Sequence, residues 1–342
     1  MAVNAAPIKD NVSKYDSDSD GYIDGVWFIY NEFDLTKVNS SRFWAYTYWY
    51  YEDSQRATSL KDCKINCFAN MAGAFNYEES VDGLDAHTLI HETGHMFGLD
   101  DYYSYDEGVN NSALGGLDMM DMNVGDHNAF SKMSLGWIDP RILNDEGKLT
   151  LKPFENSGDC LVIPSGYFNN SAFGEYYIIQ YYTPNGLNKL DSTSRYSTRD
   201  LLYSQNGLLI YHIDARLGKS IYDFTTGKSS FQNVYLDSSL TTIPDAIDTN
   251  TSSTYYNVIA SNTLSSSANK NPLIGLVDRK NDKVYNKHSG SNSSLWVEGD
   301  TINKTTTSSY LNNGKWYEGS EFTYSISVDQ MTDEGATLSF SK

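Results

Sequence analysis

The chain has 342 residues, with 44 acidic against 25 basic side chains and a formal net charge of -19. Such a surface repels phosphate backbones and anionic lipid headgroups, so the charge disfavours a nucleic-acid or membrane-surface role and favours hard cations as partners. Hydrophobic residues make up 39% of the chain and aromatic residues 14%, which excludes a disordered acidic protein. No stretch approaches the roughly 20 apolar residues of a membrane-spanning helix. We expect a folded protein without membrane insertion.

The chain is longer than most domains that fold around a single hydrophobic core, so we expect two domains. Three cysteines, Cys63, Cys67 and Cys160, form at most one disulfide bond. Free thiols and a local bridge both stay open for Cys63 and Cys67, whereas Cys160 is expected as a small buried residue at the start of a strand. Cysteine content alone therefore does not indicate the compartment.

The first predicted feature in chain order is an acidic loop, residues 16–24, that leads into a predicted strand over residues 21–30. Its spacing matches the first nine positions of a calcium loop, with Gly21 at the turn. The predicted calcium ligands are Asp16, Asp18, Asp20, the Tyr22 carbonyl and Asp24. Trp27 stands where an EF-hand has its bidentate glutamate, which excludes an EF-hand. The alternative is an acidic turn without metal.

Residues 43–51 form a second predicted strand with aromatic side chains on both faces. It is either covered on both sides, or it lines a cleft and offers rings and backbone to a ligand. Over residues 80–98 the apolar residues recur at offsets of three and four, which predicts a helix with Asp82 or Asp85 as its N-cap. An acidic loop follows, and then a second helix is predicted over residues 127–135.

Short alternating runs separated by polar turn residues begin at about residue 141. The clearest are residues 176–182, 208–213 and 336–340. This pattern of short alternating runs and polar turns indicates a β-rich, sandwich-like domain. Residues 237–270 are expected to leave it as a long mobile excursion, that is, an irregular surface segment. We therefore predict an α+β fold, in which residues 1–140 form an α/β domain and residues 141–342 the β-rich domain.

The most informative segment is His91-Glu92-Thr93-Gly94-His95, an HExxH sequence inside the predicted helix. Residues four apart lie on one face about 6 Å along the axis, so both histidines can bind one ion. Glu92, offset by one position, can reach a metal-bound water as general base. Chance placement predicts roughly 0.004 such matches in a chain of this composition. The segment therefore indicates a catalytic zinc site.

Gly98 allows the helix to end in a left-handed turn, which brings the Asp101 carboxylate back to the ion as third ligand. Two imidazoles and a carboxylate leave the fourth tetrahedral position open for water, as in catalytic zinc sites. Two alternatives stay open: Asp100 or a more distant residue as third ligand, and a surface helix with solvated histidines. His87 shares the helix face but stands about 12 Å of rise from His95, too far to share its ion.

Several segments together resemble the secreted bacterial metallopeptidases of the immune inhibitor A family. They are residues 91–103 (HETGHMFGLDDYY), 117–121 (LDMMD), 125–132, 135–137, 16–24 and 174–214. The resemblance covers most of residues 15–215 and implies an exported, metzincin-like zinc endopeptidase made with a leader and a prosegment. The family's catalytic domain begins well upstream of the calcium-like loop, so the resemblance also implies that this chain lacks that upstream part.

The resemblance further implies a methionine turn beneath the metal, which falls on Met120. A thioether there shapes an apolar floor without competing strongly for zinc, and the alternative is an ordinary core methionine. His127 is either a hydrogen-bond donor beside the site or a structural residue at a helix start. The family usually has proline in place of Asp100, which keeps the third ligand open.

We predict a secreted zinc-dependent endopeptidase that acts on proteins or peptides, with Glu92 as general base. Zn²⁺ is the expected catalytic metal and Ca²⁺ a structural one, and a monomer is favoured. The alternative is an extracellular, calcium-stabilised binding or adhesion module with an inactive or latent metal site. Glu92 favours the enzyme, because a binding module has no reason to keep it. A glycosidase with paired carboxylates has little support.

Overall fold

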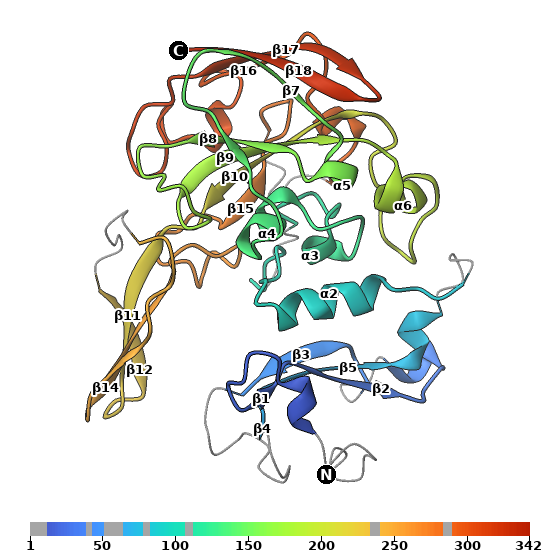
Figure 1. The fold of residues 1–342 in the computed structure, drawn as a ribbon, viewed down its shortest axis with the longest axis vertical. Coiled ribbons are helices and arrows are strands. Elements are labelled where there is room, and N and C mark those ends of the chain that lie inside the picture. Colours follow the sequence, from blue (N-terminus) through green and yellow to red (C-terminus); the bar gives the residue numbers. More distant parts are fainter. Residues whose placement is uncertain are drawn as a thin grey trace. The chain divides into compact units, whose positions relative to one another are not determined.

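The computed structural model describes residues 12–38, 43–50, 64–77, 83–106, 112–232, 240–282 and 289–342. The chain divides into two compact units, unit 1 (Met1–Asp100) and unit 2 (Asp101–Lys342). Both units combine strands with short helices, and strands predominate (Figure 1). The predicted α+β class is confirmed at this level.

Unit 1 is built on a three-stranded sheet in the order β2-β5-β3. Its strands are β2 (Val26–Tyr30), β5 (Cys67–Ala72) and β3 (Tyr46–Trp49), with β2 parallel and β3 antiparallel to β5. Helix α2 (His87–Met96) lies along one face of this sheet (Figure 1). The central strand β5 is buried because it has a strand on each side and the helix above it.

The strand predicted over residues 21–30 is wrong in one respect, because it is two strands. Strand β1 (Tyr22–Ile23) pairs in parallel with β4 (Lys64–Ile65), and β2 starts at Val26. The strand is interrupted at Asp24, whose backbone N–H donates to the Tyr15 carbonyl at 2.9 Å. The Asp24 carboxylate also accepts from the Ser17 N–H at 3.1 Å, so Asp24 belongs to the acidic loop.

The aromatic strand is open on one face. Tyr46 and Tyr48 are 41% and 42% exposed on the face away from α2, so the prediction of a strand covered on both sides is wrong. Tyr51 lies outside the described residues. Short helical segments complete unit 1: η2 (Val12–Tyr15), α1 (Leu35–Val38) and η3 (Gly73–Asn76).

The helix predicted over residues 80–98 is shorter in the structure, where α2 spans His87–Met96. Asp82 lies outside the described residues. The N-cap of α2 is Ala86, so the prediction of Asp85 as N-cap is wrong. The Asp85 carboxylate still accepts from the His87 N–H at 2.9 Å and satisfies a backbone donor at the helix start.

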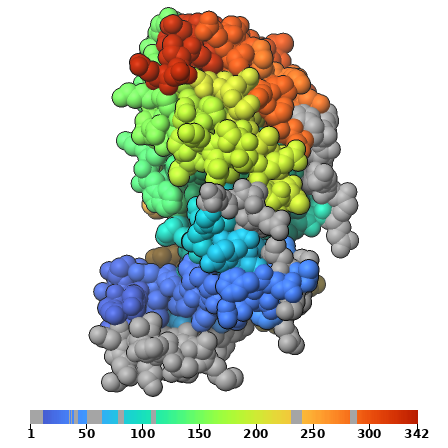
Figure 2. Space-filling view, turned by 90° about the vertical axis from the view of Figure 1, so that its right-hand side faces the viewer, coloured from blue at the N-terminus to red at the C-terminus, as the bar shows by residue number. Residues whose placement is uncertain are grey.

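Two of the sheets in unit 2 pack face to face with an apolar core between them. The first sheet has the order β15-β10-β9-β8-β6, with β15 (Ile274–Leu276), β10 (Gly207–Asp214), β9 (Glu175–Tyr182), β8 (Cys160–Pro164) and β6 (Arg141–Ile142). The second has the order β16-β17-β18-β7, with β16 (Thr301–Ile302), β17 (Ser325–Thr332), β18 (Gly335–Ser341) and β7 (Gly147–Leu151). Figure 2 shows the C-terminal residues in red beside green residues, in line with the β18–β7 pairing.

Strand β9 is buried on both faces. Tyr177, Ile179 and Tyr181 join the core between the sheets. The opposite face meets α4 (Ala129–Ser134), where the Gln180 side chain accepts from the Ala129 N–H at 2.8 Å. Helix α3 (Met119–Met122) precedes α4 in the same unit. These helices therefore belong to unit 2, and the division at Asp100 differs from the expected boundary near residue 140. Helix α4 is also shorter than the predicted 127–135.

A third sheet extends away from the rest of unit 2 (Figure 1). Its order is β12-β11-β14-β13, with β12 (Lys228–Gln232), β11 (Leu217–Asp223), β14 (Ser252–Val258) and β13 (Ile247–Asp248). Residues 237–270 were predicted as a long mobile excursion, and within them the structure places β13 and β14, of which β14 pairs with β11 along Ser252–Val258. This part of the segment is therefore a strand rather than a loop. The remaining elements are α5 (Phe154–Ser157), η4 (Gly186–Asn188), α6 (Lys189–Thr193), η5 (Asn292–Ser294) and η6 (Ser308–Tyr310).

Cys67 and Cys160 are free and buried. Cys160 begins β8, as predicted. Burial raises the pKa of the Cys67 thiol to about 11 and that of Cys160 to about 12, so neither is a reactive thiolate at neutral pH. Cys63 lies outside the described residues. Within the described parts, no helix has the length and apolar composition to cross a membrane.

Candidate metal centre

Helix α2 brings the two histidines of the HExxH sequence together. The ring centroids of His91 and His95 are 4.8 Å apart, with the ring planes at 89°. His91 is 5% exposed and His95 is partly buried. The spacing of four residues thus places both imidazoles on one helix face, as predicted.

The turn after α2 fixes how His95 presents its ring. Gly98 adopts a left-handed conformation with φ of +92°, as predicted, and the Leu99 N–H returns to the Gly94 carbonyl at 3.0 Å. The Leu99 carbonyl then lies 2.7 Å from His95 Nδ1. A carbonyl can only accept, so Nδ1 carries the hydrogen and the lone pair lies on Nε2. That tautomer presents Nε2 as a metal ligand.

Ligand atoms of His91, His95 and Asp101 all lie within 4.8 Å of one another. Two imidazole nitrogens and a carboxylate oxygen are the donor set of a catalytic zinc site with an open fourth position, so these residues fit zinc. Asp100 is exposed and does not belong to the group. The structure therefore favours the Asp101 assignment over its alternative.

Sequence reasoning missed Tyr105. Its hydroxyl donates a hydrogen bond to Asp101 Oδ2. A phenol on a carboxylate oxygen orients that carboxylate, as the outer partners of metal ligands usually do. Tyr105 stands four residues after Asp101 in an irregular segment, where no periodic pattern marks a partner.

Glu92 is 6% exposed and is held by β3. The Thr47 hydroxyl lies 3.0 Å from Glu92 Oε2 and 2.8 Å from the Glu92 carbonyl, and its single proton is shared between them. The indole of Trp49 donates to the His95 carbonyl at 3.1 Å. Thr47 was not singled out from the sequence. The only sequence feature that distinguishes Thr47 is that it is a small polar residue within an aromatic strand.

Met120 is fully buried in α3, and the Tyr102 N–H donates to its carbonyl at 2.8 Å. The chain just after Asp101 is therefore tied to the predicted methionine turn. His127 does not belong to the metal group: it is 7% exposed and its ring lies 6.2 Å from that of Trp137. It precedes α4, whose N-cap is Asn128, which supports the structural role for His127.

Two buried carboxyl groups flank Met120. Asp118 accepts from the Met120 N–H at 2.9 Å and from the Asn128 amide at 2.9 Å. Asp121 Oδ2 accepts from the N–H groups of Leu114 and Gly116 at 3.2 and 2.8 Å. Burial raises the pKa of each carboxyl group to about 7. Both therefore change protonation near neutral pH.

These carboxyl groups predict a pH dependence of stability. Their pKa values are raised in the folded state, so the folded chain binds more protons than the unfolded chain between about pH 4 and pH 7. Their contribution to stability is complete below about pH 4 and is lost as the pH rises through about 7. The neutral Asp121→Asn variant, which keeps an oxygen for both N–H donors, should therefore lose less Tm between pH 5 and pH 8 than the wild type.

Thermal melting across this pH range checks the prediction. The control is Asp139→Asn, which changes an exposed carboxylate and should keep the wild-type profile. Identical pH profiles for Asp121→Asn and the wild type would contradict a raised Asp121 pKa.

The acidic loop brings together ligand atoms of Asp16, Asp18 and Asp24 within 4.8 Å. Asp20 does not belong to this group, and its carboxylate accepts from the Tyr22 N–H at 2.8 Å. Gly21 has a φ of +89°, in line with the turn predicted there. The structure therefore brings together three of the predicted calcium ligands, Asp16, Asp18 and Asp24, and does not place Asp20 with them.

Calcium is expected to raise the Tm of the chain, because binding to the folded state alone stabilises it by mass action. Asp16→Asn should abolish this increase, since it removes the charge of one of the three grouped carboxylates. Differential scanning calorimetry with calcium and with a calcium chelator measures the effect. Asp245→Asn, at an exposed site elsewhere, is the control. Equal Tm values in calcium and chelator would contradict the site.

Two comparisons with known proteins found no match. No protein-family model matches the chain, and no curated protein matches it. The functional assignment therefore depends on the chain's own residues and their geometry.

Proposed function

We propose that this protein is a secreted, metzincin-like zinc endopeptidase that hydrolyses peptide bonds in proteins. The observation that supports this most is the grouping of His91, His95 and Asp101 within 4.8 Å, with Glu92 beside them in α2. A zinc ion bound there would supply a Lewis acid that polarises the scissile carbonyl and acidifies water.

Hydrogen bonds from neighbouring groups orient two of the proposed zinc ligands, His95 and Asp101. His95 keeps its Nε2 lone pair because Nδ1–H donates to the Leu99 carbonyl. Asp101 supplies a negative charge, and the Tyr105 hydroxyl orients its carboxylate. Two neutral imidazoles and one carboxylate give the site a net charge of about -1, which suits a cation that must also keep a position for water.

Glu92 is the proposed general base. Its carboxylate accepts a proton from the attacking water and then donates it to the leaving amine. The Thr47 hydroxyl, 3.0 Å from Oε2, holds the carboxylate in one orientation from the neighbouring strand. Thr47 thus acts as a positioning residue, and Met120 is the proposed floor of the site.

The acidic loop is proposed as a structural calcium site in unit 1. Asp16, Asp18 and Asp24 bring negative charge together at the start of the sheet, and their mutual repulsion disfavours the loop unless a cation offsets it. Calcium takes oxygen ligands of this kind, so Ca²⁺ is the proposed occupant.

Hydrolysis of casein or gelatin with and without a zinc chelator tests the proposed function. Hydrolysis should stop on chelation and return when zinc is added back. Hydrolysis that persists after complete zinc removal contradicts the metal mechanism. A chain that binds zinc but cleaves neither substrate would instead support the binding-module alternative.

A further inference from the structure

The third proposed zinc ligand lies in a segment that belongs to no helix or strand. Residues 101–106 follow α2 as irregular chain, apart from one isolated bridge. His91 and His95 are fixed by the helix that carries them, whereas the direction of Asp101 depends on the contacts of this segment. The Asp101 carboxylate can keep its place beside the histidines only if other parts of the chain hold the segment.

A loop of unit 2, residues 261–271, supplies such contacts. The Asn262 amide donates to the Tyr102 carbonyl at 2.7 Å, and its oxygen accepts from the first N–H of β15 at 3.1 Å. Asn262 is 2% exposed, so both bonds are shielded from water, which strengthens them. The Tyr102 N–H donates in turn to the Met120 carbonyl. Both peptide groups of Tyr102 are thus held, which fixes the direction in which the chain leaves Asp101.

The same loop holds the residue that orients the Asp101 carboxylate. The Tyr105 N–H donates to the Thr263 hydroxyl oxygen at 2.9 Å, and the Tyr105 hydroxyl donates to Asp101 Oδ2. One residue further along the segment, the Asp106 carboxylate accepts from the Ser265 N–H at 3.2 Å. The loop therefore binds the segment that carries the metal ligand at three points.

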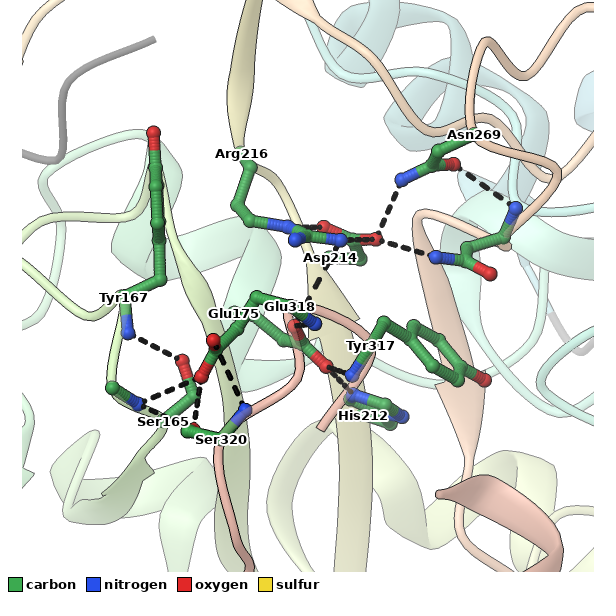
Figure 3. Close-up of polar contacts among 12 residues, drawn as sticks. Ser165, Tyr167, Glu175, His212, Asp214, Arg216, Asn269, Tyr317, Glu318 and Ser320 are labelled. Atoms are coloured by element: carbon green, nitrogen blue, oxygen red, sulfur yellow. Dashed lines mark hydrogen bonds and ion pairs between the residues drawn. The ribbon is translucent and has the colours of Figure 1, made fainter. Parts of the chain in front are cut away.

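The other end of the loop is anchored on β10 (Figure 3). The amides of Asn269 and Asn271 donate to Asp214 Oδ2 at 2.8 and 3.1 Å. Asp214 ends β10 and is fully buried, and Arg216 Nε and Nη2 donate to its two oxygens at 2.6 and 2.7 Å. Figure 3 shows Asn269 and Arg216 on opposite sides of Asp214. The loop is therefore tied to a buried ion pair at one end and to the segment after α2 at the other.

Neighbouring groups keep this anchor in place. Glu175 begins β9 and is in register with Asp214, so two carboxylates lie opposite each other. Like charges in this position repel, and Arg216, whose Nη2 is 3.8 Å from Glu175 Oε2, offsets the repulsion. Glu175 also accepts from His212 Nε2 at 2.9 Å and from the Tyr317 N–H at 2.6 Å. The loop is therefore fixed to a buried part of the sheet that several bonds hold in one arrangement.

We propose that the 261–271 loop positions the zinc ligand Asp101, with Asn262 and Thr263 as positioning residues. This inference rests on the proposed zinc site, and it makes the metal affinity depend on residues 160 positions from the segment that they hold. Outer partners of metal ligands typically contribute 10–100-fold to metal affinity. Because the loop acts through the Asp101 segment and not on the metal, the expected effect of each contact is at the lower end, about tenfold.

The zinc affinity of the full chain, measured by competition with chelators of graded strength, tests this proposal. Thr263→Val keeps the shape of threonine but removes the acceptor for the Tyr105 N–H, so it should weaken zinc binding about tenfold. Thr263→Ser keeps the hydroxyl and should retain the affinity that Thr263→Val loses. Asn262→Asp sets an oxygen against the Tyr102 carbonyl and should also weaken zinc binding about tenfold or more. Thr225→Val, the same change at an exposed position of unit 2, is the control.

A combined variant separates positioning of Asp101 from a purely structural role of the loop. In a chain that carries Asp101→Ala, the loop has no ligand left to position, so adding Thr263→Val should leave the remaining zinc affinity unchanged. Melting curves of the zinc-free chains identify a variant that fails to fold, and if Asn262→Asp fails, Thr263→Val decides. Unchanged zinc affinity in folded Thr263→Val, or an equal loss with and without Asp101, would overturn the proposal. A wild-type chain that binds no zinc would instead refute the proposed zinc site, and this inference with it.

Discussion

A chain with glutamine in place of Glu92 is expected to retain zinc and to hydrolyse casein roughly 10²–10⁴-fold more slowly than the wild type. Glutamine has the size of glutamate and can still accept from the Thr47 hydroxyl, so the helix and its contact with β3 should persist. An amide, however, cannot take a proton from the attacking water. Initial rates on fluorescent casein, with zinc measured on the same samples, give both quantities.

The matched control is Glu334→Gln, which makes the same chemical change at an exposed position in unit 2. It should cleave casein at the wild-type rate. A Glu92→Gln variant that also cleaves at the wild-type rate would refute the role of Glu92 as general base.

Replacing Asp101 with alanine should weaken zinc binding by at least about 100-fold, because loss of a metal ligand costs more than the 10–100-fold typical of an outer partner. Hydrolysis should fall with zinc occupancy. Competition with a chromophoric chelator measures the zinc affinity.

Asp100→Ala is the control for this change, since the two aspartates are adjacent and only Asp101 joins the histidine group. The Asp100 variant should bind zinc with wild-type affinity. If Asp100→Ala loses zinc and Asp101→Ala keeps it, the third ligand is assigned to the wrong residue.

The part of the site that the sequence predicted depends on local geometry. His91, Glu92 and His95 stand on consecutive turns of one helix, and Gly98 ends that helix in the left-handed turn expected of glycine. Such features follow from residue spacing within a few turns, so no knowledge of the rest of the fold is needed.

The parts that sequence analysis missed depend on contacts between distant segments. Thr47 reaches Glu92 across 45 residues, and His212 meets Glu175 across 37. The first contact depends on how α2 packs on β3, and the second on the register of β9 and β10, where Glu175 lies diagonal to His212. A single sequence gives neither. The separation of Asp20 from the calcium group was also not predicted, because the spacing of acidic residues does not fix where each carboxylate points within the loop.

In the fold as well, features with a strong local sequence pattern were predicted and features that depend on distant contacts were not. Strands β9, β10 and β18 were predicted because their runs of apolar and aromatic residues are strong, and each lies where expected. Strand β14 was missed because its polar residues resemble a loop, although β11 pairs with it. The division into units at Asp100 was not predicted, because the contact between α4 and β9 is not visible in the sequence.

The central claim is that His91, His95 and Asp101 hold a catalytic zinc ion. Elemental analysis of purified wild-type protein, dialysed beside a variant that carries both His91→Ala and His95→Ala, tests it most directly. The account predicts about one zinc ion per wild-type chain and none in the variant. A wild-type chain that binds no zinc when zinc is supplied, or a variant that retains it, would contradict the account.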